Sequence, residues 1–262
     1  MADTPVLEAR GVSKYFGHVI ALEGITMDVR AGEVLCLLGD NGAGKSTLIK
    51  TLAGVHYPEK GEYLVDGERV HFRSPSDALD AGIATVYQDL ALVPLLSVAR
   101  NFFMGREPGK RLFGLLPVMD HEYAAQVARD KLSDMGIRVR DANQAVINMS
   151  GGEKQCLAIA RAIHFGASVL ILDEPTAALG VKQSVNVLKL IARARAKGIS
   201  VIFITHNVNH AYPVADSFTL LNRGTSLGTY EKAKISKDDV LDMMAGGAEM
   251  KTLMQGLEGV TI

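Results

Sequence analysis

The fold of this chain is decided by the stretch Gly39-Asp40-Asn41-Gly42-Ala43-Gly44-Lys45-Ser46. It matches the pattern Gly-x-x-x-x-Gly-Lys-Ser/Thr without a departure. A glycine-rich loop of this kind turns successive backbone N–H groups inward around an anion. A helix that begins at its end points its positive dipole at the same place. Lys45 adds a charge for the β- and γ-phosphates, and the Ser46 hydroxyl can ligate Mg²⁺. The stretch therefore predicts a nucleotide phosphate site.

The flanking residues supply the structural context that such a loop requires. Residues 33–38 form a short apolar run, typical of a buried strand. Residues 47–53 place Leu48, Ile49 and Leu52 on one helical face. Strand, loop and helix follow one another in the order that phosphate binding needs, so we interpret the loop as functional.

Composition limits the classes of protein that the chain can belong to. The 262 residues carry 28 Lys and Arg against 29 Asp and Glu, and neither sign forms a long run. This balance argues against a dedicated nucleic-acid surface, which would show a basic stripe. Cys36 and Cys156 sit in apolar patterns, as expected for buried thiols in a reducing compartment.

No segment reads as a signal peptide or as a membrane helix, which needs roughly 18 apolar residues. We therefore expect a soluble, cytoplasmic chain that a partner brings to any membrane.

Strand patterns lie at both ends of the chain. Residues 6–30 alternate apolar and polar side chains, which predicts an antiparallel sheet, and Asp66-Gly67 predicts a hairpin turn. Residues 168–172 and 199–204 are continuous apolar runs, as in central parallel strands that are covered on both faces.

Helical periodicity dominates the middle of the chain. It runs from about residue 89 to residue 161 and returns over residues 184–197. The fold class that follows is α/β, with a core that is interrupted by a helical insertion.

An acid pair ends the strand over residues 168–172. Asp173 is placed to hold Mg²⁺, and Glu174 lies one residue further, toward the γ-phosphate. A general base there can orient or deprotonate a water molecule, worth about 10²–10⁴ in rate. Two solvated acids at a strand end are the plainer interpretation, and the glycine loop favours the functional one.

A second glycine-containing motif is Ser150-Gly151-Gly152-Glu153. Ser150 and Glu153 predict a capping box for the helix that follows. The two glycines in its first turn each cost up to about 1 kcal/mol in helix propensity. A cap does not need them, whereas a backbone that must approach a phosphate does. We therefore expect this motif to bind an anion.

Polar residues follow two further strands. Gln88 and His206 each come after an apolar run, and ligands of parallel sheets bind at the carboxyl ends of strands. These residues should therefore gather with the glycine loop and the acid pair. Tyr15 and Phe16 are both candidates to stack on a base, although an edge strand could hold either for packing alone.

Taken in this order, the motifs resemble those of the ATP-binding subunits of ABC transporters, over residues 6–228. The resemblance implies a P-loop NTPase core with a mostly parallel sheet, an antiparallel β-subdomain and an inserted helical subdomain. It implies one ATPase domain over residues 6–246, with a tail over 247–262. Within the domain, 6–88 and 162–246 would form the core and β-subdomain, and 89–161 the helical subdomain.

The resemblance also assigns roles to residues. The catalytic residues are Glu174 as the base, His206 as the switch histidine, and Lys45. The Mg²⁺ that accompanies the ATP substrate is assigned to Ser46, Gln88 and Asp173. Phe16 matches the adenine-stacking aromatic better than Tyr15. The ATP-binding residues are Phe16, Gly39, Asp40, Asn41, Gly42, Ala43, Gly44, Lys45, Ser46, Thr47 and Gln88.

Members of this family work in pairs. Two ATPase domains sandwich two ATP molecules head to tail, so Ser150, Gly151, Gly152 and Glu153 would act on the ATP of the partner. The pair could be a homodimer or a heterodimer. It would dock peripherally on permease subunits at the cytoplasmic face of the inner membrane, with an extracytoplasmic sugar-binding protein as an indirect partner and no nucleic acid.

Four stretches are similar to importers of ribose, xylose and fructose. They are Gly39–Gly42, Gln88–Pro94, Gly105–Pro108 and Thr205–Val208. Many such importers fuse two ATPase domains, whereas this chain has one. The segment after Glu174 departs from the family pattern at Gly180, where an aspartate is usual. Glycine cannot make the polar contact that this aspartate makes across the dimer, which puts communication between the two ATP sites in question.

Three alternatives stay open. An ABC importer ATPase could serve a non-sugar solute. A soluble ABC-type ATPase could act on nucleic acid or ribosomes, usually with tandem domains or basic extensions that are not visible here. A P-loop GTPase or small-molecule kinase would leave Ser150–Glu153 unexplained, and no Asn-Lys-x-Asp guanine motif is present.

Overall fold

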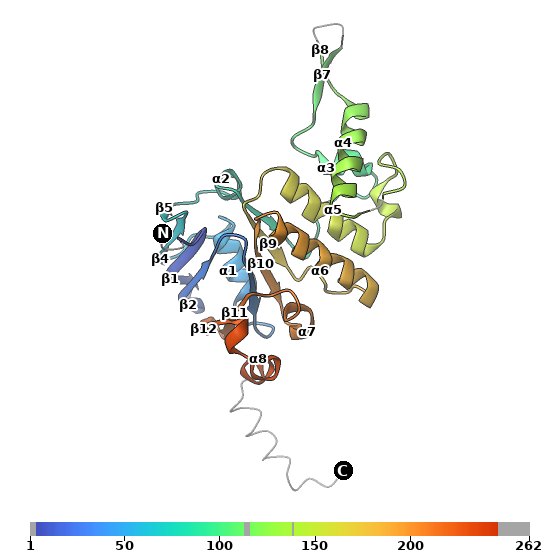
Figure 1. The fold of residues 1–262 in the computed structure, drawn as a ribbon. Coiled ribbons are helices and arrows are strands. Elements are labelled where there is room, and N and C mark those ends of the chain that lie inside the picture. The colour runs from blue at the N-terminus through green and yellow to red at the C-terminus, as the bar shows by residue number, and fades with distance from the viewer. Residues whose placement is uncertain (1–3, 113–115, 138, 246–262) are drawn as a thin grey trace.

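The computed structural model describes residues 4–112, 116–137 and 139–245 (Figure 1). The tail that the sequence suggests over residues 247–262 lies outside these ranges.

A six-stranded, mostly parallel sheet forms the centre of the molecule. Its strand order is β12-β11-β3-β10-β9-β6, with only β12 antiparallel to its neighbour among these strands. The strands are β3 (Val34–Leu38), β6 (Ile83–Val86), β9 (Val169–Asp173), β10 (Ser200–Thr205), β11 (Ser217–Asn222) and β12 (Thr225–Glu231). Every residue of β3 and β10 is buried, as the continuous apolar runs of the sequence predict.

A second, antiparallel sheet lies beside α1 and has the order β2-β1-β4-β5 (Figure 1). It confirms the prediction for residues 6–30. The strands are β1 (Leu7–Phe16), β2 (Val19–Val29), β4 (Lys60–Val65) and β5 (Glu68–Val70). Asp66 and Gly67 join β4 to β5 with φ of 50° and 81°. Two positive φ angles are those of a type I′ hairpin turn.

Helices cover both faces of the central sheet, which is why β3, β9 and β10 are mostly apolar and buried. They are α1 (Lys45–Leu52), α2 (Pro75–Asp80), α6 (Val181–Ala196), α7 (Val208–Ala211) and α8 (Lys237–Met244). Alternate residues of β3 enter two hydrophobic clusters. Leu35 packs with Leu48 of α1 and with the antiparallel sheet, whereas Cys36 packs with Leu190 of α6.

Residues 89–161 fold largely as helices, beside the central sheet (Figure 1). The elements are α3 (Val98–Phe102), α4 (His121–Asp134), the 3₁₀ turn η1 (Val146–Asn148) and α5 (Gly151–His164). A hairpin of β7 (Gly109–Leu112) and β8 (Leu116–Met119) interrupts this mostly helical stretch and projects from it. Neither strand alternates apolar and polar residues, so no strand pattern marks the hairpin in the sequence.

None of the helices in the described ranges is long and apolar enough to cross a membrane. Cys36 and Cys156 are both buried free thiols, as the sequence predicts.

Candidate nucleotide site

Four parallel strands end at one edge of the central sheet. Leu38 of β3 pairs with Thr205 of β10, and Asp173 of β9 pairs with Ile204 of β10. Val86 of β6 pairs with Leu172. The residues that follow these strand ends therefore meet at one edge, as expected for ligand sites of open parallel sheets.

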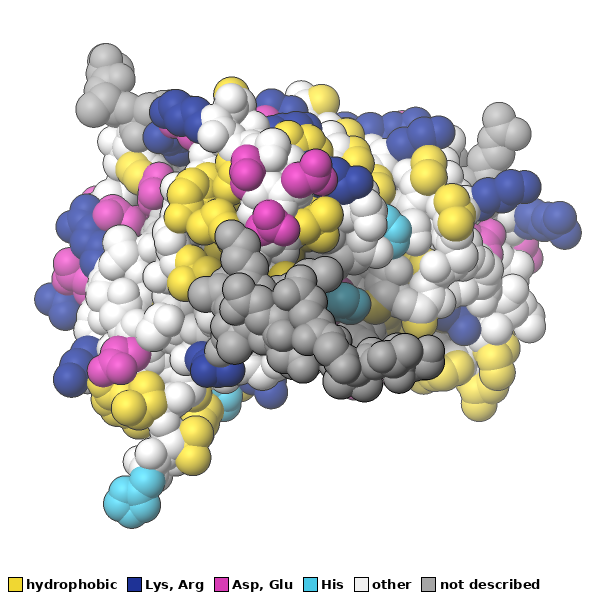
Figure 2. Space-filling view, turned by 90° about the horizontal axis from the view of Figure 1, so that it is seen from below, with side chains coloured by type: hydrophobic (Ala, Val, Ile, Leu, Met, Phe, Trp, Pro, Cys, Tyr) yellow, Lys and Arg dark blue, Asp and Glu magenta, His cyan; other side chains and the backbone are white. Residues whose placement is uncertain are grey.

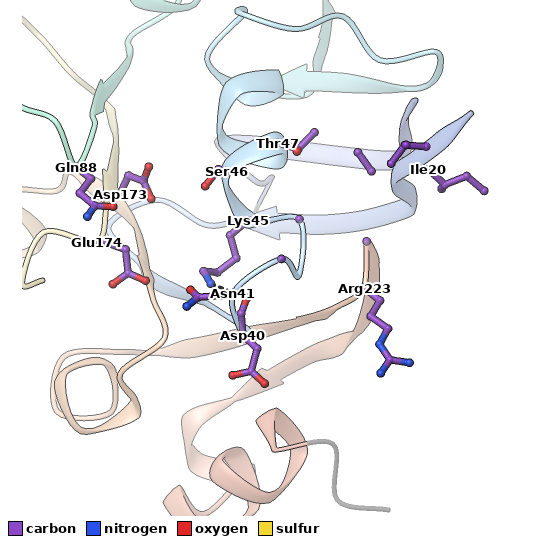
Figure 3. Close-up of a pocket in the computed structure, with 15 residues that line it drawn as sticks. Ile20, Asp40, Asn41, Lys45, Ser46, Thr47, Gln88, Asp173, Glu174 and Arg223 are labelled. Atoms are coloured by element: carbon purple, nitrogen blue, oxygen red, sulfur yellow. Dashed lines mark hydrogen bonds between the residues drawn. The ribbon is translucent and has the colours of Figure 1, made fainter. Parts of the chain in front are cut away.

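A cavity of about 500 Å³ opens at this edge. Gln88, Asp173 and Glu174 group on one side of it, Ile20 and Arg223 lie on the other, and Lys45 lies between (Figure 3). The residues that line the cavity are Val19, Ile20, Ala21, Asp40, Asn41, Gly42, Gly44, Lys45, Ser46, Thr47, Gln88, Asp173, Glu174, Arg223 and Gly224.

The glycine loop is closely fitted to the strands around it. Gly44 is the N-cap of α1 at a φ of 99°, and a Cβ atom there would lie 2.9 Å from Cδ2 of Leu22. Glycine alone suits both the angle and the space. The Lys45 Nζ donates to the carbonyl oxygens of Gly39 at 2.6 Å and Asp40 at 3.0 Å. Its ammonium therefore stays inside the loop.

Burial lowers the pKa of Lys45, while Glu174, Asp40 and Asp173 oppose the shift by their charges. Burial of Asp173, together with the charge of Glu174, raises the pKa of its carboxyl above the usual value of 3.8. Two carboxylates, Asp173 and Glu174, therefore lie close together on a poorly solvated side of the cavity. Such a place favours a bound cation.

Glu174 is held by three donors from the end of β10. Its carboxylate accepts from the Thr205 hydroxyl at 3.0 Å and from the His206 backbone N–H at 3.0 Å. The His206 Nδ1 lies 2.7 Å from the same carboxylate. The backbone of Glu174 has a φ of 46°, which costs a non-glycine residue of order 1–3 kcal/mol. The surroundings of this carboxylate fix it in place.

The side chains present suit Mg²⁺. Ser46, Gln88 and Asp173 line the same cavity and offer a hydroxyl, an amide and a carboxylate oxygen. Within the described residues, no three or more His, Cys, Asp or Glu side chains gather as a metal cage. Mg²⁺ commonly takes one or two carboxylates and completes its octahedron with phosphate oxygens and water, so these ligands fit it when nucleotide is present.

Ser150 and Glu153 form the predicted capping box of α5. The Ser150 N–H donates to the Glu153 carboxylate at 2.8 Å, and the Ser150 hydroxyl accepts from the Glu153 backbone N–H. Ser150, Gly152 and Glu153 line a different cavity of about 410 Å³, between α5 and α6. In the described parts of the chain, none of these motif residues reaches the cavity of the glycine loop.

Four other sequence-predicted residues also lie outside the lining of the first cavity. Gly39 supports the loop, since a Cβ there would come within 2.5 Å of the Leu221 carbonyl oxygen. Ala43 is buried. His206 contacts Glu174 instead. The Phe16 ring is half exposed, lies edge-on to His56 with centroids 5.2 Å apart, and has the Lys14 ammonium above it.

Sequence reasoning missed the wall formed by Val19, Ile20, Ala21, Arg223 and Gly224. The hairpin between β11 and β12 reaches the loop because the Gly224 N–H donates to the Ala43 carbonyl at 3.0 Å. The turn Arg223-Gly224 between these strands predicts a hairpin from the sequence alone. Its local pattern does not predict contact with the glycine loop at residues 39–46.

Comparison with known proteins shows the family and the fold of this chain. The family model described as ABC transporter matches residues 22–177. The xylose/arabinose import ATP-binding protein XylG of Sulfolobus acidocaldarius is 42% identical, over 93% of this chain and 95% of its own length. The fructose import ATP-binding protein FrcA of Rhizobium meliloti is 43% identical, over 95% and 97%.

Some relatives are longer. The chain spans about half of a ribose/galactose/methyl galactoside import ATP-binding protein of Burkholderia cenocepacia, which is 41% identical and of which 46% is covered.

Solved structures agree on the fold. A nucleotide-free ATP-binding cassette from an ABC transporter has a TM-score of 0.79 at 21% identity, covering 91% of this chain and 96% of its own. The cbiO1 protein of Clostridium perfringens, part of an ABC transporter complex, has a TM-score of 0.75 at 25% identity, covering 92% and 93%. The resemblance seen in the motifs is thus confirmed: this chain belongs to the ABC transporter family and is one of its ATP-binding ATPase subunits.

Proposed function

We propose that this subunit hydrolyses ATP to energise the uptake of a monosaccharide through partner permease subunits. The observation that carries the proposal is similarity along nearly the whole chain to two relatives of matching length, named as xylose/arabinose and fructose import proteins. The relatives differ in their sugar, so the proposal stops at the class of monosaccharide.

The loop and Lys45 bind the phosphates of ATP in this proposal. Backbone N–H groups of residues 39–46 surround the phosphates, and the Lys45 ammonium exchanges its two loop carbonyls for β- and γ-phosphate oxygens. Ser46, Gln88 and Asp173 hold Mg²⁺, which, when bound, neutralises charge that develops on the phosphate oxygens. Ile20 then lies on the side of the site where the base would stack (Figure 3), and Phe16 pairs with Val19, another residue of that wall.

Glu174 is the general base. Its carboxylate accepts a proton from the water that attacks the γ-phosphate, in line with the leaving oxygen. Thr205 and His206 orient that carboxylate by the hydrogen bonds they already make to it. His206 is half exposed, and in this proposal its other ring nitrogen would contact a γ-phosphate oxygen.

Two chains are required to complete each site. Ser150–Glu153 line a cavity that is separate from the glycine loop of the same chain. In a head-to-tail pair, the motif of one chain would meet the ATP of the other, and the first-turn N–H groups of α5 would face its γ-phosphate. Residues 6–246 would act as a single ATPase domain, and its helical part, residues 89–161, would deliver this motif.

The pair would dock peripherally on permease subunits at the cytoplasmic face of the inner membrane. An extracytoplasmic sugar-binding protein would hand its ligand to that permease. The described part of the face in Figure 2 shows Lys and Arg interspersed with Asp, Glu and uncharged side chains, which supports this over binding to nucleic acid. The net charge of −1 points the same way.

The test is affinity purification of the tagged chain from its own detergent-solubilised membranes. A multi-spanning permease, together with a sugar-binding protein, is the expected result. Ribosomal or DNA-bound partners without a permease would overturn the transport proposal. A permease with a binding protein for another solute would overturn the monosaccharide class.

A further inference from the structure

The two glycines of the Ser150–Glu153 motif touch residues of their own chain. A Cβ atom on Gly152 would lie 2.9 Å from the Gln183 Cβ and 3.1 Å from its Cγ. A Cβ atom on Gly151 would lie 3.2 Å from Cδ2 of Leu179. Real Cβ contacts below 3.0 Å essentially do not occur. Gly152 therefore has a packing reason to be glycine, in addition to any approach to a phosphate.

Gln183 connects two helices at their first turns. Its Oε1 accepts from the Gly180 N–H at 3.2 Å, which caps α6 where the N-cap glycine has no side chain to do so. The aliphatic part of the same side chain lies against Gly152 in α5. One side chain thus fixes the start of α6 and supports the backbone of the motif.

The segment from Glu174 to Gly180 is short and firmly held. The Ala177 N–H donates to the Glu174 carbonyl at 3.0 Å, and the Thr176 hydroxyl lies 2.9 Å from Nδ1 of His210. Ala178 has a φ of 56°, an uncommon angle for alanine. This short, constrained segment therefore ties the backbone of Glu174 to the start of α6.

We propose that Gln183 is a positioning residue that sets the backbone of residues 151–153 and links it to the segment that begins at Glu174. The inference rests on the head-to-tail pair of the proposed function. In that pair, Glu174 serves one ATP and the Ser150–Glu153 motif of the same chain serves the other. The contact through Gln183 therefore joins the two ATP sites within one chain. This contact does not need the aspartate that is usual in the family at position 180, where this chain has glycine.

Two substitutions test whether the bond to the Gly180 N–H holds the Gln183 side chain against Gly152. Gln183→Met keeps the aliphatic atoms but loses the acceptor that fixes their position, whereas Gln183→Glu keeps both. Gln126→Met is the matched control, because Gln126 is exposed on α4 and its side chain donates to Asp130 of the same helix, away from the motif. All three are made in the full chain, and thermal unfolding with ADP checks that each folds.

The first measurement is amide hydrogen exchange at residues 151–153 in the nucleotide-free chain, which needs neither pairing nor hydrolysis. Gln183→Met should speed exchange there, and Gln183→Glu and the Gln126 variant should leave it as in the wild type. Unchanged exchange in Gln183→Met would overturn the positioning role.

The second measurement is steady-state ATP hydrolysis. We expect Gln183→Met to lower kcat by about tenfold to a hundredfold, since displacements of about 1 Å have such effects. Affinity for ADP should stay the same, because Gln183 does not line the cavity of the glycine loop in the described chain. Gln183→Glu should restore kcat. Wild-type kcat in Gln183→Met, or an equal loss in both variants, would refute the link. Absence of hydrolysis in the wild type would instead refute the proposed function, and hydrogen exchange would still decide the positioning role.

Discussion

At the scale of residues, Glu174 and its neighbours show how a reactive group is held ready. Three hydrogen-bond contacts from Thr205 and His206 fix the carboxylate, and the backbone at φ 46° is strained. Asp173 beside it carries a raised pKa. The site therefore concentrates negative charge, which Mg²⁺ bound with ATP would relieve.

Replacing Glu174 by glutamine should slow ATP hydrolysis by about a hundredfold or more, because the amide accepts no proton from water. The amide keeps the size of the side chain, so ATP binding and pairing should persist. Phosphate release measures the rate, and light scattering measures the ATP-bound pair. A variant that hydrolyses ATP at the wild-type rate, or that stays monomeric with ATP, would contradict the assigned role.

Phe16→Ala should weaken ATP binding by about 1–3 kcal/mol if its ring stacks on the base. Calorimetry on Phe16→Ala and Ile20→Ala in parallel measures how much each side chain contributes to binding of the adenine base. Ile20 lines the cavity, and Phe16 is 45% exposed. Unchanged affinity in Phe16→Ala would transfer the stacking role to Ile20 or Tyr15.

Asp173→Asn should stabilise the nucleotide-free chain near neutral pH. A raised carboxyl pKa means that the folded chain binds more protons than the unfolded chain. The free energy of unfolding therefore falls as the pH rises from 3.8 through the folded pKa. Asparagine carries no charge and escapes this loss, and the advantage should vanish below about pH 4.

Urea unfolding across a pH series makes that measurement. Asp77→Asn is the control of opposite sign, because hydrogen bonds from the Arg73 backbone and from Ser74 lower the pKa of Asp77. Its carboxylate adds stability above its unfolded pKa, so its loss should destabilise the chain at neutral pH. A destabilised Asp173→Asn would contradict the burial argument.

At the scale of elements, the sequence predicted those strands and helices whose signal is local. Continuous apolar runs gave β3, β9 and β10, and Asp66-Gly67 gave the turn between β4 and β5. The hairpin of β7 and β8 was not predicted, because neither strand alternates apolar and polar residues.

The site was predictable only on one side. Residues that follow strand ends converge by a general rule of parallel sheets. The opposite wall depends on a backbone hydrogen bond between Gly224 and Ala43, which no local pattern encodes. The packing of Gly152 on Gln183 is also non-local. From the sequence, we explained Gly152 by close approach to a phosphate. The fold adds a second reason, because α6 packs against Gly152 through Gln183.

Gly180→Asp should stabilise α6 by about 0.5–1 kcal/mol. Gly180 is the N-cap at φ −68° and ψ 161°, an ordinary extended conformation, and it lacks a side-chain cap. Aspartate would accept from first-turn N–H groups and restrict the unfolded chain. Gly180→Ala is the control, because alanine restricts the chain but caps poorly. Equal stabilisation by both in urea unfolding would attribute the gain to the unfolded state alone.

At the scale of the whole molecule, the glycine loop and the Ser150–Glu153 motif line separate cavities. In the proposed head-to-tail pair, each ATP site would combine the loop of one chain with the start of α5 from the other. A single chain should therefore be a poor ATPase, and its specific activity should rise with protein concentration.

Mixing two inactive variants should restore activity. Lys45→Ala removes the phosphate contact, and Ser150→Phe blocks the motif of α5. A head-to-tail pair of one chain of each kind holds one intact site, formed by the normal loop of the second and the normal motif of the first. The mixture should reach about a quarter of wild-type hydrolysis, because half of the pairs are mixed and each has one of two sites. Activity no greater than that of the separate variants would refute the shared site.

The Lys45 contacts to Gly39 and Asp40 also bear on how fast nucleotide arrives. Bonds within the chain order the loop around the Lys45 ammonium, so we expect its conformational entropy to be lost during folding and not at the moment of binding. Nucleotide then exchanges one set of partners for another without waiting for a disordered segment to order. Association should therefore proceed at the rate of a rigid site, and differences in affinity among loop variants should appear chiefly in how long the nucleotide stays.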